Sequence, residues 1–302
     1  MFIIKLTGGL GNQMFQYALG RSLSIKNNQP MKLDTRNYFL NSLDTKTDTR
    51  IYGLKHFAIN APIASREEIS RILSAAPRNK LLTLFDRIKA ASLVYPYYMG
   101  YVIKEPDGNL WKFDERLLDH LFTHDVYIKG YWQTERYFSS ESKTIKKEFS
   151  VITPPSEYNR LTLNRIKSCN ATSLHIRRGD NTNPENPSGT LPMTYYEQAT
   201  TIIKLKFPNT HFFVFSDDIN WAKKNLSIGF NVTYIENEAS LDYEDMRLMM
   251  NCNNHVIANS TFSWWGAWLA YQNNNLVVAP KRYQQRGPRA NPDFYPSTWI
   301  LI

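Results

Sequence analysis

Short apolar runs alternate with helical patterns along most of the chain. Residues 2–7 (FIIKLT) form a β-rich run that ends in glycines, and a second such run covers 31–33. Between them, apolar residues recur every three or four positions, which is typical of one face of a helix. These residues are Met14, Phe15, Ala18, Leu19 and Leu23. The first part of the chain therefore predicts a strand, a glycine turn, a helix and a second strand.

The middle of the chain has weaker patterns. Helical spacing is present at 66–76 and 79–91, and an aromatic, strand-like run follows at 94–103. Residues 126–138 (VYIKGYWQTERYF) predict a strand that leads into an aromatic loop, and a charged helix is expected at 139–148. The aromatic residues of this region are candidates for a sugar-stacking wall, with core packing expected for at least half of them. They are Tyr127, Tyr131, Trp132, Tyr137 and Phe138.

Strand–helix alternation is clearest after residue 160. The expected strands are 172–177, 211–216, 231–236, 255–258 and 276–279. The expected helices are 194–206, 218–226, 242–252 and 262–272. Such alternation predicts an α/β fold with a parallel, doubly wound sheet. Ligands of such sheets bind beyond the carboxyl ends of the strands, so residues that follow strands are candidates for a site.

Length and a proline pair suggest two domains. The chain has 302 residues, which suits two domains of about 150 residues each. Pro154 and Pro155 end regular structure, because the residue before a proline avoids the helical region, and the pattern changes after them. We therefore expect an N-terminal domain at 1–153 and a C-terminal domain at 154–302.

Composition excludes several classes of protein. Hydrophobic residues make up 42% and charged residues 21%, which excludes wholesale disorder. The two cysteines, Cys169 and Cys252, cannot form a disulfide framework or a four-ligand zinc site, which indicates a reducing compartment. The six histidines show no metal-ligand spacing, so no metal is expected. Polar residues interrupt the uncharged stretch between Arg247 and Lys281, which predicts a buried segment and not a membrane span.

The net charge of +9 suits an anionic partner: a nucleotide, a nucleic acid or an acidic membrane surface. Together with 18 Tyr, 16 Phe and 7 Trp, it makes a nucleic-acid-binding protein one alternative. However, the basic residues are spread along the chain and form no recognition module, so no nucleic acid is expected. Docking to an anionic membrane surface explains the charge more simply.

The segment from His175 to Asp180 (HIRRGD) ends an expected strand. On that strand, His175 and Arg177 lie on one face and Ile176 on the other. Two adjacent guanidinium groups suit a diphosphate, which they can bind bidentately as a leaving group. The alternative is a solvated arginine pair in a turn braced by Asp180. The position at a strand end favours the diphosphate.

Two further strand ends carry polar groups. Asp217 and Asp218 are candidates for binding ribose hydroxyls or a guanine N–H, or only for capping the next helix. A later strand leads to Ser260, Thr261 and Ser263, each of which can be a helix N-cap. The free backbone N–H groups at such a helix start favour an anion.

The glycine turn at 8–13 (GGLGNQ) is similar to a dinucleotide-binding fingerprint, and Asp34 lies at a fitting distance for a ribose. However, Met14 stands where the third glycine would be required. Three alternatives follow. The turn belongs to a nicotinamide-dependent oxidoreductase, it lets backbone and the Asn12 side chain approach another ligand closely, or it is a plain tight turn.

Four segments together resemble the α-1,2-fucosyltransferase family (glycosyltransferase family 11), in its bacterial branch. In chain order they are GGLGNQMFQYA at 8–18, HIRRGD at 175–180, FSDD at 215–218 and NSTFSWWGAWL at 259–269. The segment GYWQTERYF at 130–138 is similar to a further block of the family. The resemblance implies a GT-B fold, in which two Rossmann-like domains face each other across a cleft. The C-terminal domain would bind GDP-L-fucose, and the N-terminal domain would bind most of the acceptor.

The resemblance also implies a reaction. L-Fucose would move from GDP-L-fucose to O2 of a terminal β-galactose, with inversion to an α1,2 linkage and without a metal or cofactor. Anchored animal relatives carry a membrane helix before the glycine block, which here starts at residue 8. This implies a cytoplasmic bacterial enzyme, peripheral at the inner membrane, that acts on lipid-linked precursors of a surface glycan of the O-antigen type.

The resemblance also implies roles for particular residues. Arg177 and Arg178 would stabilise the departing β-phosphate, and Asp180 and Glu185 are the candidates for the general base. The donor-binding residues implied are Gly9, Gly11, Asn12, His175, Arg177, Arg178, Asp217, Asp218, Asp245, Ser260, Thr261 and Ser263. The acceptor-binding residues implied are Gln13, Trp132, Gln133 and Tyr137.

Overall fold

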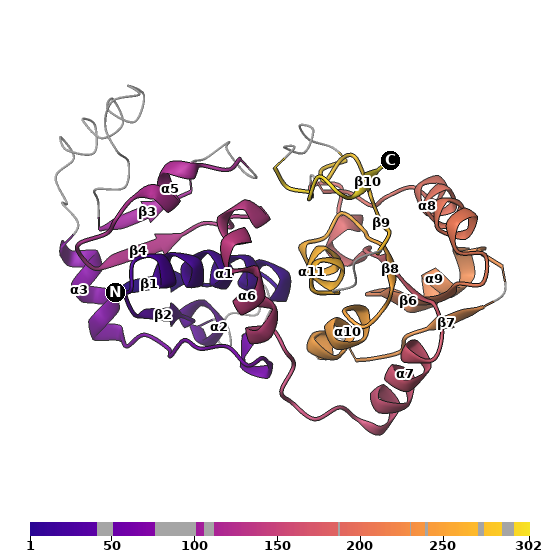
Figure 1. The fold of residues 1–302 in the computed structure, drawn as a ribbon, viewed down its shortest axis with the longest axis horizontal. Coiled ribbons are helices and arrows are strands. Elements are labelled where there is room, and N and C mark those ends of the chain that lie inside the picture. The colour runs from indigo at the N-terminus through magenta and orange to yellow at the C-terminus, as the bar shows by residue number, and fades with distance from the viewer. Residues whose placement is uncertain are drawn as a thin grey trace. The chain divides into compact units, whose positions relative to one another are not determined.

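The computed structural model divides the chain into two compact units, coloured by residue number in Figure 1. It describes residues 1–40, 51–75, 101–105, 112–186, 188–229, 231–238, 241–270, 275–285 and 293–302. The first unit contains Met1–Leu54 and Ile59–Glu148, and the second contains Lys55–Ala58 and Phe149–Ile302. The expected helix at 79–91 and most of the expected strand at 94–103 lie outside the described residues.

The first unit is built on a four-stranded parallel sheet. Its strand order is β2-β1-β4-β3. The strands are β1 (Phe2–Lys5), β2 (Met31–Asp34), β3 (Val102–Lys104) and β4 (Val126–Lys129). The helices are α1 (Leu10–Lys26), α2 (Arg36–Leu40), α3 (Arg66–Ala75), α5 (Glu115–Asp119) and α6 (Ser142–Glu148). Short 3₁₀ turns are η2 (Leu54–His56), η4 (Glu135–Tyr137) and η5 (Ser139–Glu141).

Helices α1 and α3 cover opposite faces of this sheet. Ile69 and Ile72 of α3 pack with Ile3 of β1, whereas Gly20 of α1 lies against Ile4, the next residue of the same strand. Successive side chains of a strand point to opposite faces. A Cβ at Gly20 would lie 2.4 Å from Ile4 Cγ1, so glycine allows α1 to approach the sheet closely.

The second unit is built on a six-stranded parallel sheet of order β10-β9-β8-β5-β6-β7. Its strands are β5 (Ala171–Ile176), β6 (His211–Ser216), β7 (Val232–Tyr234), β8 (Asn254–Val256), β9 (Val277–Ala279) and β10 (Ile300–Leu301). This is the doubly wound order of a Rossmann sheet. All five strands expected after residue 160 are therefore confirmed, and β10 is an additional strand.

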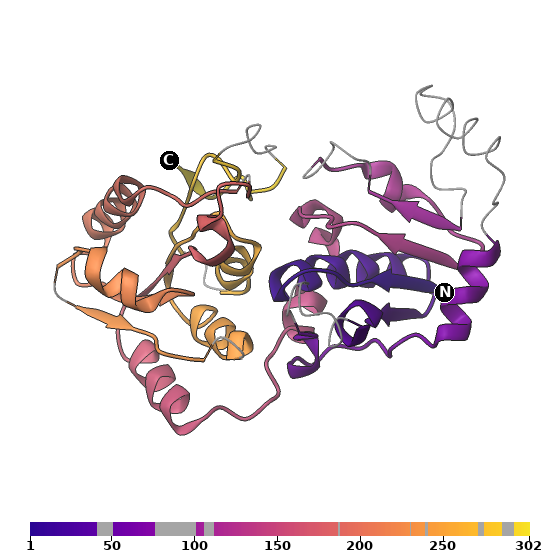
Figure 2. The same cartoon turned by 180° about the vertical axis from the view of Figure 1, so that it is seen from behind.

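Helices cover both faces of the second sheet, which Figures 1 and 2 show from opposite sides. They are α7 (Glu157–Lys167), α8 (Met193–Lys206), α9 (Ile219–Asn225), α10 (Asp242–Met249) and α11 (Thr261–Leu269). On one face, Leu174 and Val214 pack with α8 and α9. On the other face, Phe213 and Phe215 pack with α7 and α10. This layered arrangement confirms the expected α/β class.

The division between the units falls at Glu148/Phe149, whereas the sequence predicted it at 153/154. Packing explains the difference. The buried Phe149 ring lies 6.0 Å from that of Phe57 and 5.1 Å from that of Trp265. Residues 151–153 are also tied to the second unit, because the Arg247 guanidinium donates to the carbonyls of Val151 and Thr153. The proline pair interrupts secondary structure, but side-chain burial decides where the unit begins.

The long uncharged stretch near the C-terminus holds α11, a helix of nine residues whose tryptophans Trp264 and Trp265 are fully buried. This agrees with the expectation of a buried segment. Across the described residues, no helix combines the length and apolar character that a bilayer crossing requires.

Candidate active site

The second sheet reverses its strand order between β5 and β8, which are hydrogen-bonded neighbours. After β5 the chain continues to α8 on one face, and after β8 it continues to α11 on the other. Such a reversal opens a crevice at the carboxyl ends of the two strands, where ligands of doubly wound sheets bind. The arginine motif follows β5 directly, and the Asn259–Ser260 segment follows β8.

Carboxylates hold the Arg177 guanidinium from two sides. Its Nη2 lies 2.7 Å from Asp180 Oδ1, and its Nη1 lies 2.8 Å from Asp217 Oδ2. Gly179 makes the second contact possible, because a Cβ there would lie 2.6 Å from Asp217 Oδ2. Asp180 is therefore the brace that the sequence offered as one alternative, and the arginine is fixed before any ligand arrives.

Arg178 is held by a different set of groups. Its backbone N–H donates to Asp217 Oδ1 at 2.8 Å, and its Nε lies 3.3 Å from Asp218 Oδ2. The guanidinium carbon lies 3.8 Å from the ring centroid of Trp221 on α9, within cation–π range. Asp218 also accepts from the Trp221 backbone N–H, so it both caps α9 and pairs with an arginine. Sequence reasoning missed Trp221, whose only signal was its place three residues after the capping aspartate.

His175 lies on β5 beneath this cluster and is 4% exposed. Burial, reinforced by the charge of Arg177, lowers the pKa of His175 to about 3. The imidazole is therefore neutral near pH 7. Its Nδ1 has no hydrogen-bond partner among the described residues. A buried ring nitrogen without a partner is costly, and a ligand at the crevice is one group that can satisfy it.

Of the acidic residues at the start of α10, Glu244 is buried, and Asp242 and Asp245 are half-buried. Burial raises the pKa of Asp245 to about 7, and that of Asp242 to about 6. Asp245 Oδ1 accepts from Asn237 Nδ2 at 2.8 Å, and Glu244 pairs with Arg247. Within the described part of the chain, no group of three or more His, Cys, Asp or Glu side chains is arranged to hold a metal ion.

Ser260 is the N-cap of α11, since its Oγ accepts from the Phe262 backbone N–H at 3.3 Å. Of the three capping candidates, the structure therefore selects this one. Thr261 and Ser263 are buried in the first turn. The Ser263 hydroxyl lies near the carbonyls of Ala258 and Ser260, at 3.5 and 3.4 Å.

Asn259 ties a loop to the end of β8, a role that sequence reasoning missed. Its buried side-chain Nδ2 donates to the carbonyls of Ser188, Gly189 and Tyr283, at 2.9, 3.0 and 2.9 Å. Ser188 and Gly189 end the loop that carries Glu185. The Glu185 side chain is exposed, and its backbone N–H donates to Asn183 Oδ1 at 3.0 Å.

In the first unit, the glycine turn follows β1, and β4 is a neighbour of β1 in the sheet. Gly8 has φ +78° and packs against the Asn12 side chain, and Gly9 is the N-cap of α1. Asn12 Oδ1 accepts from Gln133 Nε2 at 2.8 Å, so this residue pair brings the glycine turn and the turn after β4 together. Gly11 lies in the first turn of α1 and is buried.

Asp34 does not serve a dinucleotide, which corrects one of the alternatives. Both of its oxygens bind Arg36, at 2.9 Å each, and Oδ2 also accepts from the Tyr127 hydroxyl at 2.7 Å. The Asp34 side chain is 3% exposed. These partners lower the pKa of Asp34 despite its burial. A carboxylate that is used in this way offers no oxygen for a ribose.

Three of the four expected acceptor-binding side chains are committed to the interior of the first unit. Trp132 and Tyr137 are each 2% exposed and meet edge to face, with ring centroids 5.7 Å apart. Gln13 is buried and bonds the carbonyls of Gly8 and Ile51 and the N–H of Gly53. These residues shape the turn and do not present surface to a sugar. Core packing explains the two rings, because aromatic side chains bury a large apolar area.

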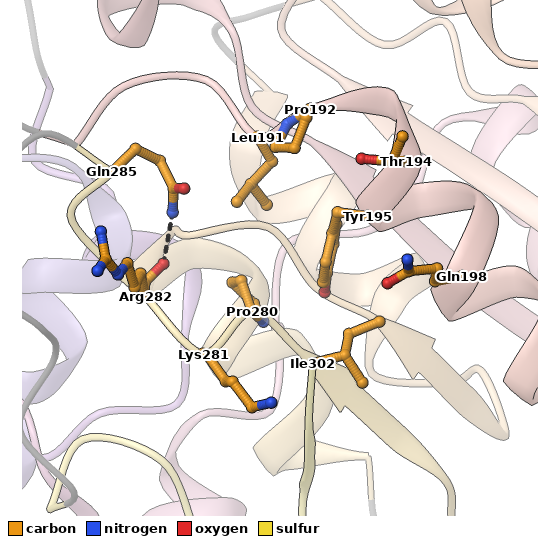
Figure 3. A pocket seen from close by; sticks show the side chains of 10 residues that line it. All are labelled: Leu191, Pro192, Thr194, Tyr195, Gln198, Pro280, Lys281, Arg282, Gln285 and Ile302. Atoms are coloured by element: carbon orange, nitrogen blue, oxygen red, sulfur yellow. Dashed lines mark hydrogen bonds between the residues drawn. The ribbon is translucent and has the colours of Figure 1, made fainter.

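A cavity of about 290 Å³ lies beside the first turn of α8. Figure 3 shows Tyr195 and Pro192 on one side of it and the segment from Pro280 to Gln285 on the other. None of the expected site residues lines it. Its connection to the site is Gln285, whose backbone N–H donates to the carbonyl of Ser188 in the Glu185 loop.

Two Rossmann-like units, with a fixed arginine pair at the switch point of the second sheet, define a glycosyltransferase of the GT-B class. The family model for glycosyl transferase family 11 matches residues 66–302. The chain belongs to this family.

Two relatives agree with this assignment, and a solved structure agrees with the fold. The α-1,2-colitosyltransferase of Escherichia coli is 32% identical, with 99% of this chain and 98% of the relative covered. The O-antigen biosynthesis glycosyltransferase WbnK of E. coli is also 32% identical, with 92% and 93% covered. The crystal structure of fucosyltransferase NodZ from Bradyrhizobium has a similar fold, with a TM-score of 0.52, 12% identity, and 88% and 91% of the chains covered.

Proposed function

We propose that this enzyme transfers L-fucose from GDP-L-fucose to O2 of a terminal β-galactose, with inversion, during synthesis of a bacterial surface glycan of the O-antigen type. The observation that carries the proposal is the Arg177–Arg178 pair, fixed at the switch point of the second sheet. The names of the two E. coli relatives support an α1,2 linkage and an O-antigen product. The four sequence segments support GDP-L-fucose as donor.

The arginines would act on the leaving group. Negative charge builds on the β-phosphate as the bond to fucose breaks, and preorganised donors lower the barrier most where charge develops. A guanidinium has five N–H donors, and the carboxylate contacts of Arg177 use only part of this set. The carboxylates thus hold the guanidinium in position and leave donors for a phosphate. In this role the arginines supply the positive charge, and we expect transfer without a metal.

The remaining donor-binding residues would surround the nucleotide. The unpaired Nδ1 of the neutral His175 suits a base or ribose. Asp217, Asp218, Asp245, Ser260, Thr261 and Ser263 lie on segments that follow strands or begin helices of the same sheet. Gly9, Gly11 and Asn12 belong to the first unit, and the family resemblance alone supports a donor-binding role for them.

The general base must accept the proton of the galactose O2. The ion pair between Asp180 and Arg177 supports Glu185 over Asp180 for this role, because removal of the Asp180 charge would also release the arginine. Glu185 is exposed on a loop that Asn259 anchors. We therefore expect Glu185→Gln to lose transfer while GDP-L-fucose still binds.

The experiment is incubation with GDP-L-fucose and a panel of β-galactosides in excess EDTA, followed by product mass and linkage analysis. An α1,2-fucosylated product supports donor, linkage and metal independence together. GDP-colitose is tested in parallel, because colitose is the 3-deoxy form of L-fucose and one relative is a colitosyltransferase. Faster transfer of colitose would replace the proposed donor, and consumption of neither sugar would overturn the proposal.

The net charge of +9 supports peripheral contact with an anionic membrane, where a lipid-linked acceptor would be found. Flotation with vesicles that contain anionic lipid tests this contact. Binding that disappears in neutral vesicles would support it. Absence of binding at low salt would contradict it.

A further inference from the structure

The turn after β4, residues 130–133, has an unusual backbone. Gly130 has φ +151° and Trp132 has φ +54°. A bulky residue in the left-handed region costs about 1–3 kcal/mol and persists only where the surroundings determine it. Trp132 carries a second cost, since its buried Nε1 has no acceptor among the described residues. Two such costs on one residue indicate that the shape of this turn matters.

Glu105, the residue after β3, holds the turn in this shape. Its Oε2 accepts from the Tyr131 backbone N–H at 2.7 Å, and its Oε1 accepts from that of Trp132 at 3.2 Å. The carboxyl is 8% exposed, and burial raises its pKa. Gly130 is required beside it, because a Cβ there would lie 2.5 Å from Glu105 Cβ. A buried carboxylate thus binds two consecutive N–H groups of a strained turn.

The constrained turn gives the neighbouring side chains of Tyr131 and Trp132 different exposures. Trp132 is turned into the core, whereas Tyr131 is 39% exposed. The next residue, Gln133, donates to Asn12 of the glycine turn. Of the five aromatic residues proposed for a sugar-stacking wall, the other four are each at most 4% exposed. The exposed ring therefore belongs to the turn that follows β4, at the carboxyl ends of the strands, the edge at which doubly wound sheets bind ligands.

We propose that Tyr131 is a carbohydrate-stacking residue of the acceptor subsite, and that Glu105 is the positioning residue that presents it. This inference rests on the proposed function. In β-galactose, the C–H groups at C3, C4 and C5 form one apolar face, which suits an exposed phenol ring. The equatorial O2 lies at the edge of the sugar ring, so stacking leaves it free to receive fucose.

The experiment measures acceptor and donor separately for Tyr131→Ala and Tyr131→Phe. We expect Tyr131→Ala to raise the acceptor KM about tenfold, and Tyr131→Phe, which keeps the ring, to change it less than about twofold. The Kd of GDP-L-fucose from calorimetry should stay unchanged in both. An unchanged acceptor KM in Tyr131→Ala would overturn the stacking role.

Glu105→Gln tests the positioning role, with Glu115→Gln on the exposed start of α5 as the matched control. Glutamine keeps one acceptor oxygen and replaces the other with a donor. We expect a higher acceptor KM, an unchanged donor Kd and a smaller effect on kcat. In the wild type, the acceptor KM should also rise at low pH as Glu105 is protonated, and this rise should be absent in Glu105→Gln. Equal losses of donor and acceptor binding would indicate a merely structural role.

Saturation-transfer NMR with lactose, without donor, distinguishes this inference from the proposed reaction. Signals at galactose H3, H4 and H5 that vanish in Tyr131→Ala would support the subsite, even if fucose transfer failed. Transfer to lactose by the wild type together with unchanged signals in Tyr131→Ala would overturn the subsite and leave the proposed function intact.

Discussion

Arg177 and Arg178 are adjacent in the sequence, but the structure gives them different environments. Arg177 is held between two carboxylates, whereas Arg178 stacks on Trp221 and has a backbone bond to Asp217. Arginine suits both places because its planar guanidinium binds bidentately and stacks on aromatic rings. A lysine provides the charge without either geometry.

Replacement of Arg178 should therefore affect the reaction far more than the fold. We expect Arg178→Ala to lower kcat by about 10²–10³-fold, the usual effect of removing one transition-state donor. Arg178→Lys should restore only a small part of this loss. The measurements are kcat at saturating substrates and the melting temperature. Arg165→Lys, on the exposed face of α7, is the matched control, and near-normal turnover in Arg178→Ala would contradict the leaving-group role.

The ionisation of Asp245 makes the stability of the fold depend on pH. In the folded protein its pKa is raised to about 7 from the ordinary value of 3.8, because burial disfavours the ionised form. The unfolded chain therefore loses this proton first, and the contribution of Asp245 to stability is lost as pH rises from 3.8 through 7. Asp245→Asn should raise the melting temperature of the unliganded protein at pH 8, and the gain should decline as pH falls. A gain that is equal at pH 8 and pH 4 would contradict the raised pKa.

At the scale of elements, strands bring the motifs to one edge and loops complete the site. The ends of β5 and β6 bring Asp217 into contact with both Arg177 and Arg178. In the chain, Asp217 lies 39 residues after Arg178. The Glu185 loop has a different support. The amide of Asn259 binds the carbonyls of Ser188 and Gly189 at the end of this loop and that of Tyr283 beyond it.

Asn259→Asp should release this loop. The substitution replaces the donating amide with a carboxylate that faces three carbonyl oxygens, so the contacts become repulsive. If Glu185 is the base, kcat should fall at least about tenfold, while the Kd of GDP stays within about twofold. Initial-rate assays measure kcat, and calorimetry measures the Kd of GDP. Asn225→Asp on α9 is the control, since its amide bonds a single carbonyl. An unchanged kcat would mean that the loop does not carry the base.

At the scale of the whole molecule, each unit has its own sheet and core, and the chain crosses between them at 54/55, 58/59 and 148/149. The two groups of candidate residues are divided in the same way. The arginine cluster belongs to the second unit, and the glycine turn with Asn12 and Gln133 belongs to the first.

Nucleotide binding should therefore stabilise the second unit first. GDP at 100 times its Kd contributes about 2.7 kcal/mol to a unit that binds it, which corresponds to a rise of about 5–10 °C in melting temperature. Hydrogen exchange should show protection within 171–269 of the second unit. Arg177→Ala should abolish both effects. Protection limited to the first unit would contradict the assignment of the donor to the second.

Local patterns were sufficient to predict most of the fold after residue 160. A buried parallel strand is a short apolar run between polar loops, and this pattern can be recognised from the sequence alone. The position of the arginine motif at a strand end followed from the same reasoning. The Asp34 alternative failed because Arg36 and Tyr127 satisfy its carboxylate. Tyr127 lies 93 residues away in the chain, so local patterns could not reveal this contact.

The sequence by itself thus determined the α/β class, the family and the segments that end at the switch points. These properties depend on residue type and on spacing along the chain. Only the tertiary structure decided which carboxylate braces Arg177, which serine caps α11, and which aromatic residue of 127–138 remains exposed. Those choices depend on burial and on partners that are far apart in the sequence, because a side chain is available to a ligand only when the fold has left it without another use.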